Sequence, residues 1–340
     1  PAIMEMPYND IIRKFIDMYA GRLRNQVSFM LSACNFYMPI FEEALDAYGL
    51  PLELRYLPII ESALNPSAVS RAGASGLWQF MIGTGKIYGL ESNSLVDERR
   101  DPIKATWAAA RYLKEMYDIY GDWNLVIAAY NCGPGTINKA IRRANGETDY
   151  WKIYNYLPKE TRGYVPAFIA ANYVMTYYCD HNICPMETNI PASTDTVQVN
   201  KNLHFEQIAD LCNVPLDQIK SLNPQYKKQM IPGDSKPYTL RLPIDAISTF
   251  IDKQDTIYTH RADELFRNRK TVAVKDITPA TRKTTSAVAG KGNLTYYTIK
   301  SGDTLSTIAR KYGVTIKDIQ RWNGMSSTKI AAGKRLKIYK

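Results

Sequence analysis

The chain has 340 residues, 45% of them hydrophobic, a length typical of two or three domains with sizeable apolar cores. Lys and Arg outnumber Asp and Glu by 43 to 33, and the net charge of +10 favours a negatively charged partner. Half of this excess falls in residues 261–291 without a basic and aromatic motif, so we expect no nucleic-acid partner. No run of about 18 apolar residues is present, which predicts no transmembrane helix.

Residues 1–180 have mostly helical patterns, and strand patterns are scarce before residue 195. Residues 9–33 alternate apolar and charged faces at helical spacing, with Asn9 as the cap. A separate helix is expected over 38–49, because a proline lies near its start and a glycine at its end. Further helices are expected over 50–64, 101–121, 122–130 and 161–178.

Two segments of the C-terminal half repeat one another. Residues 197–224 align with 297–324 at an offset of 100, and each copy has the pattern strand, helix, turn, helix, loop, strand. This predicts a βααβ module of fewer than 50 residues, present twice. The identical pairs are Ile208/Ile308, Ala209/Ala309, Val214/Val314, Ile219/Ile319 and Asn223/Asn323.

These patterns divide the chain into four expected parts. A helical domain with an N-terminal extension covers 1–190, and the first module covers 195–245. Residues 246–293 form a connecting segment and a basic linker, rich in Thr, Lys and Ala, that we expect to be flexible. The second module covers 294–340. The fold class is therefore multidomain, with a mainly α domain followed by small α/β modules.

Glu61 is the first candidate for chemistry. It follows an apolar helical run, 57–60, and apolar surroundings raise the pKa of a carboxyl group by desolvating its charged form. A carboxyl that is protonated near neutral pH is a general acid, as in the glutamate of lysozyme. The alternative is a solvated surface glutamate, which is the usual place for this residue type.

The residues after Glu61 favour a binding site. Ser70 lies in a glycine-rich stretch that lets backbone approach a ligand closely, and Gln79 offers an amide. Met81 is a candidate for lining a sugar-sized groove, whereas we expect Trp78 and Phe80 to pack in the core. Farther along, Tyr130 is a candidate hydrogen-bond donor to a substrate or to the glutamate.

Three motifs, in this order along the chain, resemble those of a known family. "ESALNPSAVSRAGASGLWQFM", "AAYNCGPG" and "ETRGYVPAFIAA" are similar to the lytic murein transglycosylases with a goose-type lysozyme fold, over about residues 40–175. "YGLPLELRYLPIIES" is similar to the membrane-bound D branch. The resemblance implies that Glu61 is the single catalytic acid/base. It implies substrate contacts from Ser70, Gln79, Met81, Tyr130, Asn131 and Glu160. Position 132 is usually Ala or Ser in the family, and the small Cys132 should be tolerated there.

The resemblance also implies the reaction. The β-1,4 bond between N-acetylmuramic acid and N-acetylglucosamine would be cleaved without water, and the C6 hydroxyl would close a 1,6-anhydro ring. One carboxylate acting twice is enough for this, although Asp97, Glu98 and Glu160 are conceivable neighbours. The alternatives are a hydrolytic muramidase and an inactive glycan-binding scaffold protein. The intact Glu61 with all three motifs argues against the scaffold.

Residues 296–339 closely resemble a LysM domain, which implies binding of glycans that contain N-acetylglucosamine. The implied glycan contacts are Gly302, Asp303, Thr304, Leu305, Asn323 and Ile330. A purely structural reading, in which Asp303 and Thr304 cap the first helix, is compatible with that role. The first copy has "NLH" where the second has "GDT", so whether it still binds glycan stays open.

Partners and location follow from the same resemblance. We expect peptidoglycan glycan strands as the partner and a place in the periplasm or cell envelope, with outer-membrane anchoring through a segment outside this sequence. No cofactor is expected. No metal is expected either, since His181 between Cys179 and Cys184 has no second histidine nearby.

Overall fold

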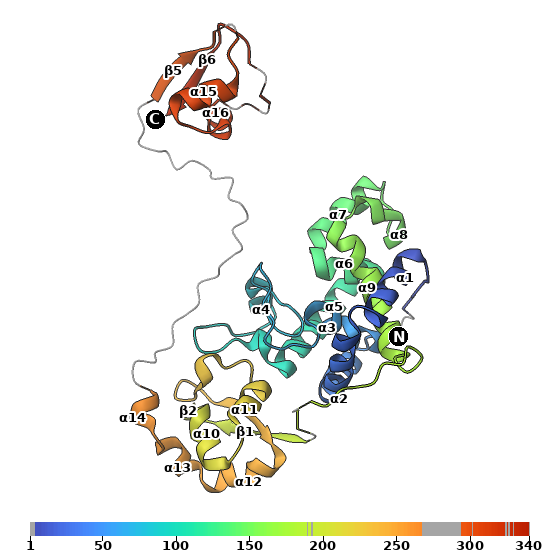
Figure 1. Ribbon diagram of the computed structural model, residues 1–340, viewed down its shortest axis with the longest axis vertical. Helices are drawn as coiled ribbons and strands as arrows, with labels where there is room; N and C mark the ends of the chain where they lie inside the picture. The colour runs from blue at the N-terminus through green and yellow to red at the C-terminus, as the bar shows by residue number, and fades with distance from the viewer. Residues whose placement is uncertain are drawn as a thin grey trace. The chain divides into compact units, whose positions relative to one another are not determined.

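The computed structural model of the chain describes residues 4–188, 190–191, 193–266, 294–300, 302–323, 325, 327–328 and 330–339. The chain forms two compact units, 1–279 and 280–340. The first unit contains the helical domain and the first module, and the second contains the second module (Figure 1). Most of the expected basic linker, residues 267–293, lies outside the described residues.

Helices build the N-terminal domain around one apolar core. Phe41, Trp78 and Phe168 are among its fully buried side chains, and α1 packs along α9 (Figure 1). The α-helices are α1 Asp10–Ala20, α2 Arg24–Ala47, α3 Leu57–Ser62, α4 Ile82–Ile87, α5 Pro102–Tyr120, α6 Trp123–Cys132, α7 Pro134–Arg143, α8 Tyr150–Ile153 and α9 Lys159–Thr176. The short 3-10 helices are η1 Leu52–Tyr56, η2 Glu98–Arg100 and η3 Tyr154–Tyr156.

The N-terminal helices differ from the expectation in where they break. Asn9 caps α1 as predicted, accepting from two backbone N–H groups, but the helix ends at Gly21. The separate helix expected over 38–49 is instead the second half of α2, which continues through Pro39. Proline costs a helix one hydrogen bond, and here the burial of Tyr37 and Phe41 on either side of it offsets that loss.

The first module has the predicted order of strand, helix, helix and strand, with a second, shorter pair of strands that was not predicted. Strand β1 (Thr194–Val199) pairs antiparallel with β4 (Tyr238–Pro243), and β2 (Asn202–His204) pairs with β3 (Met230–Pro232). Between the strands lie α10 Phe205–Cys212, α11 Leu216–Leu222 and the 3-10 helix η4 Lys227–Gln229.

The first module extends beyond the expected boundary at residue 245. Three helices follow β4: α12 Ile244–Asp252, α13 Gln254–Thr259 and α14 Ala262–Leu265. Phe250 and Ile257 are fully buried in the module's core, and the Gln207 side chain donates to the carbonyl oxygens of Tyr258 and His260. Residues 246–265 are therefore part of the folded module, and this corrects their assignment to a connecting segment.

The second module repeats the order in a smaller form. Strand β5 (Leu294–Thr298) pairs antiparallel with β6 (Arg335–Tyr339), and α15 (Leu305–Tyr312) and α16 (Ile316–Trp322) lie between them in sequence.

The asparagine shared by the two modules has a structural explanation. The side chain of Asn323 donates to the carbonyl of Lys337 and accepts from its amide, at 2.8 and 2.7 Å. Asn223 makes the same pair of bonds with Arg241. Each asparagine thus ties the end of the second helix to the last strand.

Three further observations concern the described part of the chain alone. No helix there combines the length and apolar character that crossing a membrane requires. No group of three or more His, Cys, Asp and Glu side chains in these segments is arranged to hold a metal ion. Cys179 and Cys184 are both free thiols.

Candidate active site

Glu61 lies in the last turn of the short helix α3. Leu57, Pro58 and Ile59 are buried and form the apolar base of this helix. The hydroxyl of Ser62 donates to the carbonyl of Leu77 at 2.9 Å and ties the helix end to the following loop. Ala63 and Leu64 then take left-handed backbone conformations, which end the helix directly after the glutamate.

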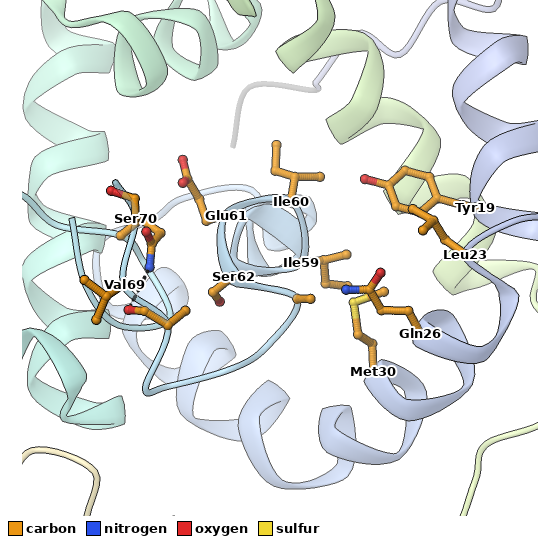
Figure 2. A pocket seen from close by; sticks show the side chains of 13 residues that line it. Tyr19, Leu23, Gln26, Met30, Ile59, Ile60, Glu61, Ser62, Val69 and Ser70 are labelled. Carbon is orange, nitrogen blue, oxygen red and sulfur yellow. Dashed lines mark hydrogen bonds between the residues drawn. The ribbon is translucent and has the colours of Figure 1, made fainter. Parts of the chain in front are cut away.

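A cavity of about 440 Å³ opens beside Glu61. Figure 2 shows α3 in the middle, with side chains from α1 and α2 on one side and the loop carrying Val69 and Ser70 on the other. Its lining residues are Tyr19, Leu23, Gln26, Met30, Ile59, Ile60, Glu61, Ser62, Ala63, Ala68, Val69, Ser70 and Gln79. Glu61 is the one carboxylate among these described lining residues.

The surroundings of Glu61 favour its protonated form. Burial raises its pKa to about 7, the hydroxyl of Tyr164 opposes this by donating to Oε1, and the charge of Glu160 adds to the rise. A carboxyl group with this pKa is present in both protonation states near neutral pH, so it can give and take a proton.

The loop from Ser70 to Gln79 is held by its own hydrogen bonds. The Ser70 amide donates to the Ala74 carbonyl at 2.9 Å, and the Ser70 hydroxyl accepts from the Ala74 amide at 3.0 Å. Gln79 has a left-handed backbone (φ 49°), and its side-chain amide donates to the carbonyl oxygens of Gly76 and Ala68 at 2.8 and 3.2 Å. Ser70 and Gln79 thus line the cavity from a loop that its own hydrogen bonds hold in place, and their role as substrate contacts stays a prediction.

Four other predicted substrate residues do not line this cavity. The Tyr130 hydroxyl donates to the Trp78 carbonyl at 2.6 Å, so in this structure it bonds neither the glutamate nor an open site. Asn131 accepts a hydrogen bond from Thr161 and lies in the last turn of α6. Met81 precedes α4, and Glu160 is exposed in the first turn of α9.

Two of the three conceivable carboxylate neighbours are committed elsewhere. Asp97 is buried and forms an ion pair with Arg99 at 2.8 Å. Glu98 pairs with Lys104 and also accepts from the Glu91 amide. Glu160 therefore stays as the one of the three whose charge affects Glu61.

Two features of the site were missed in the sequence. Tyr164 lies within the motif "ETRGYVPAFIAA", yet nothing in its spacing from Glu61, 103 residues away, indicates contact. Tyr19, Gln26 and Met30 form a wall from the N-terminal extension. Their helical periodicity predicts a buried face but does not indicate what that face meets.

The second module carries a groove of about 420 Å³. Asn323 and Ile330, both predicted glycan contacts, are among its lining residues.

The other predicted LysM residues are not part of that lining. Asp303 accepts from the Tyr297 hydroxyl and the Lys300 amide, and Thr304 caps α15 by accepting from the Thr307 amide. Leu305 is buried, and Gly302 has a left-handed backbone at the turn before the helix. The helix-capping reading therefore accounts for the contact of Thr304, whereas Asp303 bonds strand β5 and the turn before α15 and caps no helix through these contacts.

Comparisons with known proteins agree with the geometry. Residues 38–153 match the Transglycosylase SLT domain, 193–259 the LysM-like domain of lytic transglycosylase MltD, and 297–338 the LysM domain. The chain is 32% identical over 339 residues to the membrane-bound lytic murein transglycosylase D of Escherichia coli K12, covering 98% of this chain and 70% of the relative. The chain belongs to the lytic murein transglycosylase family.

More distant relatives match one part of this transglycosylase. The soluble lytic murein transglycosylase of Escherichia coli K12 is 33% identical over 124 residues, 35% of this chain and 19% of the relative. The crystal structure of the 70 kDa soluble lytic transglycosylase SLT70 from Escherichia coli matches with 29% identity and a TM-score of 0.37, over 42% of this chain and 24% of that one.

Several expectations are confirmed by these findings. The protein is an enzyme of the lytic transglycosylase class, with a mainly helical lysozyme-like catalytic domain and small LysM-type modules, and its LysM domain at 297–338 supports peptidoglycan binding. The muramidase and scaffold alternatives are not favoured.

Proposed function

We propose that this transglycosylase cleaves the β-1,4 bond between N-acetylmuramic acid and N-acetylglucosamine and leaves a 1,6-anhydromuramic acid end, with Glu61 as its single acid/base. The observation that carries the proposal is the placement of Glu61. Its carboxyl group faces a cavity of about 440 Å³ with a pKa raised to about 7. Such a group is protonated often enough to act as an acid and ionised often enough to act as a base.

The proposed reaction has two proton transfers and consumes no water. Glu61 donates its proton to the glycosidic oxygen as the bond between C1 of the muramic acid and that oxygen breaks, which releases the N-acetylglucosamine hydroxyl. The N-acetyl group of the muramic acid supports the cation at C1, as in substrate-assisted glycosidases. The Glu61 carboxylate then takes the proton of the C6 hydroxyl while O6 bonds to C1, and this restores the acid.

The geometry of the loop supports an intramolecular nucleophile. A C6 hydroxyl held against C1 has a large effective concentration compared with bulk water. Ser70 lies on one side of the cavity and Tyr19 and Gln26 on the other (Figure 2), and Gln79 also lines it, so polar groups are available to orient the sugar. Tyr164 is placed to hold the carboxyl of Glu61 while its charge changes.

The products decide between this reaction and hydrolysis. Purified sacculi are digested with the full chain, and the muropeptides are identified by mass spectrometry with and without borohydride reduction. Anhydro ends are lighter by one water and resist reduction. Chiefly reducible ends would mean a muramidase, with Glu160 as the first candidate for the second carboxylate that hydrolysis requires.

Location is the second part of the proposal. The name of the Escherichia coli relative describes a membrane-bound protein, and family membership indicates the cell envelope. We infer a place in the periplasm with attachment to the outer membrane. Membrane fractionation of cells that make the native protein tests this, since recovery in the soluble fraction alone would contradict the attachment.

A further inference from the structure

The two modules expose the same groove differently. In the second module, Met325, Ile330 and Lys334 line the groove and are half-buried or exposed. The sequence offset and the strand registers, Tyr297 opposite Leu336 and Val197 opposite Leu240, give the equivalent positions in the first module. These equivalents are Gln225 for Met325, Met230 for Ile330 and Tyr238 for Lys334, and they are 5%, 2% and 5% exposed.

A segment of the catalytic domain buries this face of the first module. Residues 91–97 lie against it, and Val96 forms an antiparallel bridge with Tyr226. The Asp97 amide donates to the Gln225 carbonyl at 2.8 Å, and the Lys227 amide donates to the Leu95 carbonyl at 2.6 Å.

The segment's apolar residues belong to the module's core. Leu95 and Val96 are 1% and 0% exposed. They pack in one cluster with Val199, Met230 and Tyr238 of the module. Val199 corresponds to Ile299, another lining residue of the second module's groove. In the first module, residues 91–97 therefore fill the space that is open to a ligand in the second module.

Hydrogen bonds within the segment and to the module hold its shape. The Asn93 side chain accepts from the amides of Leu95 and Val96 at 2.8 and 2.7 Å and makes a tight turn. Glu91 accepts from the Tyr238 hydroxyl and pairs with Lys236 at 2.7 Å. These bonds place the two apolar side chains at the tip of a rigid loop.

Buried charges connect this contact to the substrate loop, which runs from Ser70 to Gln79. Asp97 binds the Arg99 guanidinium through both oxygens, at 2.9 and 2.8 Å. Arg99 in turn donates to the carbonyl oxygens of Gly73 and Phe80 at 2.8 and 2.9 Å. From the module, the Lys227 ammonium lies 3.7 Å from the same Asp97 carboxylate and donates to the Asn93 carbonyl at 2.8 Å.

We propose that the groove of the first module is a socket for the catalytic domain's own residues 91–97, and that Lys227 is a positioning residue for the loop carrying Ser70 and Gln79. The module thereby acts as an internal brace and has no open groove for glycan. Lys227 acts through Asp97 and Arg99, because a charge that stabilises the buried carboxylate also stabilises the arginine that bonds the loop at Gly73 and directly after it at Phe80. The kinetic part of this inference rests on the proposed function.

The test uses the full chain with Lys227→Met, which keeps the aliphatic stem and removes the charge. Lys227→Arg restores the charge. Lys220→Met is the matched control, because Lys220 pairs only at the surface of the same module, with Asp217. Hydrogen exchange of residues 70–80 is followed by mass spectrometry, and KM and kcat are measured on soluble glycan strands.

For Lys227→Met we expect faster exchange in residues 70–80 and a fall in kcat/KM of about 3- to 10-fold, mainly through KM. Lys227→Arg should recover most of both, and Lys220→Met should match the wild type. If Lys227→Met behaves like the control, or if exchange rises across all of residues 4–266, the positioning role is wrong. The exchange readout needs no turnover, so a chain that proved hydrolytic would fail the proposed function and still test the brace.

Discussion

The Tyr164 hydroxyl donates a hydrogen bond to the Glu61 carboxyl across 103 residues of sequence. Glu61 lies in the last turn of the short helix α3, and Tyr164 lies in the second turn of α9, whose packing against α3 brings the two together. The bond favours the charged form of Glu61 and therefore lowers its pKa, against the larger effect of burial. Tyr164 sets both the orientation and the proton affinity of the proposed acid.

Tyr164→Phe should reduce kcat/KM by about 10- to 100-fold, since a hydrogen bond to a charged group contributes about 1.5–3 kcal/mol. Losing a bond that favours the charged form raises the pKa of Glu61, so the alkaline limb of the pH profile should move to higher pH. The profile of kcat/KM measures this. Tyr173→Phe, at an exposed tyrosine on the same helix, is the control. An unmoved limb in Tyr164→Phe would mean that Glu61 is not the titrating group.

Glu61→Gln should fold and lose activity on peptidoglycan by about 10²- to 10⁴-fold, the usual contribution of general acid–base catalysis. Gln has nearly the same shape but cannot give up an acidic proton. Turbidity clearance of sacculi measures the rate, and Glu53→Gln, an exposed glutamate near the same helix, is the control. Clearance near the wild-type rate would remove Glu61 from the mechanism.

The same substitution should stabilise the fold at alkaline pH. The pKa of Glu61 rises from the ordinary 4.5 to about 7 on folding. Below pH 4.5 both states are protonated, and the free energy of unfolding is unaffected. Between about pH 4.5 and 7 the folded state holds a proton that the unfolded state has lost, so stability falls over this range and stays lower above pH 7.

Glu61→Gln removes this titration. Because one pKa unit corresponds to about 1.4 kcal/mol and the side chain is partly solvated, we expect a gain of about 1–2 kcal/mol at pH 8 and none at pH 4. Urea unfolding of the wild type and variant at both pH values measures the difference. An equal difference at pH 4 and pH 8 would contradict the raised pKa.

Local signals predicted much of the fold and part of the site. Asn9, Asp101 and Gly121 were read correctly as helix ends because caps act within a few residues. The repeat gave the βααβ modules, and the run before Glu61 gave its apolar setting. The helix start predicted near Pro39 was wrong, because burial in the tertiary structure, which no local pattern reports, allows α2 to continue through the proline.

The rest of the site depends on contacts between distant segments. Tyr130 is a tyrosine near Glu61, as expected, yet the structure directs its hydroxyl to a carbonyl of Trp78. Hydrogen-bond partners of this kind depend on orientation, which residue type and spacing do not determine. The docking of Leu95 and Val96 into the first module could not be predicted from the sequence either, because an apolar pair in a loop indicates burial but not the residues that bury it.

That docking changes what truncation should do. The sequence suggested a catalytic domain complete at residue 190, but ending the chain there exposes Leu95 and Val96, each worth about 1.5–3 kcal/mol when buried. A chain ending at residue 266 keeps the first module and should cleave soluble glycan strands as fast as the full chain. It should bind insoluble peptidoglycan more weakly, because it lacks the second module.

Co-sedimentation with sacculi and thermal unfolding compare the full chain with the chains 1–190 and 1–266. Chain 1–190 should unfold at a lower temperature than 1–266. Equal sedimentation of 1–266 and the full chain would show that the second module does not anchor the enzyme. Equal stability of the two truncated chains would contradict the brace.

Two glycines of the substrate loop offer a matched pair for the last prediction. Gly73 and Gly76 have nearly the same left-handed backbone, with φ of 88° and 89°. A Cβ on Gly73 would meet no atom within 4 Å, whereas a Cβ on Gly76 would lie 1.8 Å from the Arg99 carbonyl oxygen. Both substitutions by alanine carry the strain of a positive φ, about 1–2 kcal/mol, but Gly76→Ala must also push the loop away from Arg99. We therefore expect Gly73→Ala to keep at least a third of the wild-type activity and Gly76→Ala to lose at least 10-fold, with a lower unfolding temperature. Initial rates on soluble glycan strands measure this, and equal rates for the two variants would mean that the contact between the loop and Arg99 does not position Ser70 and Gln79.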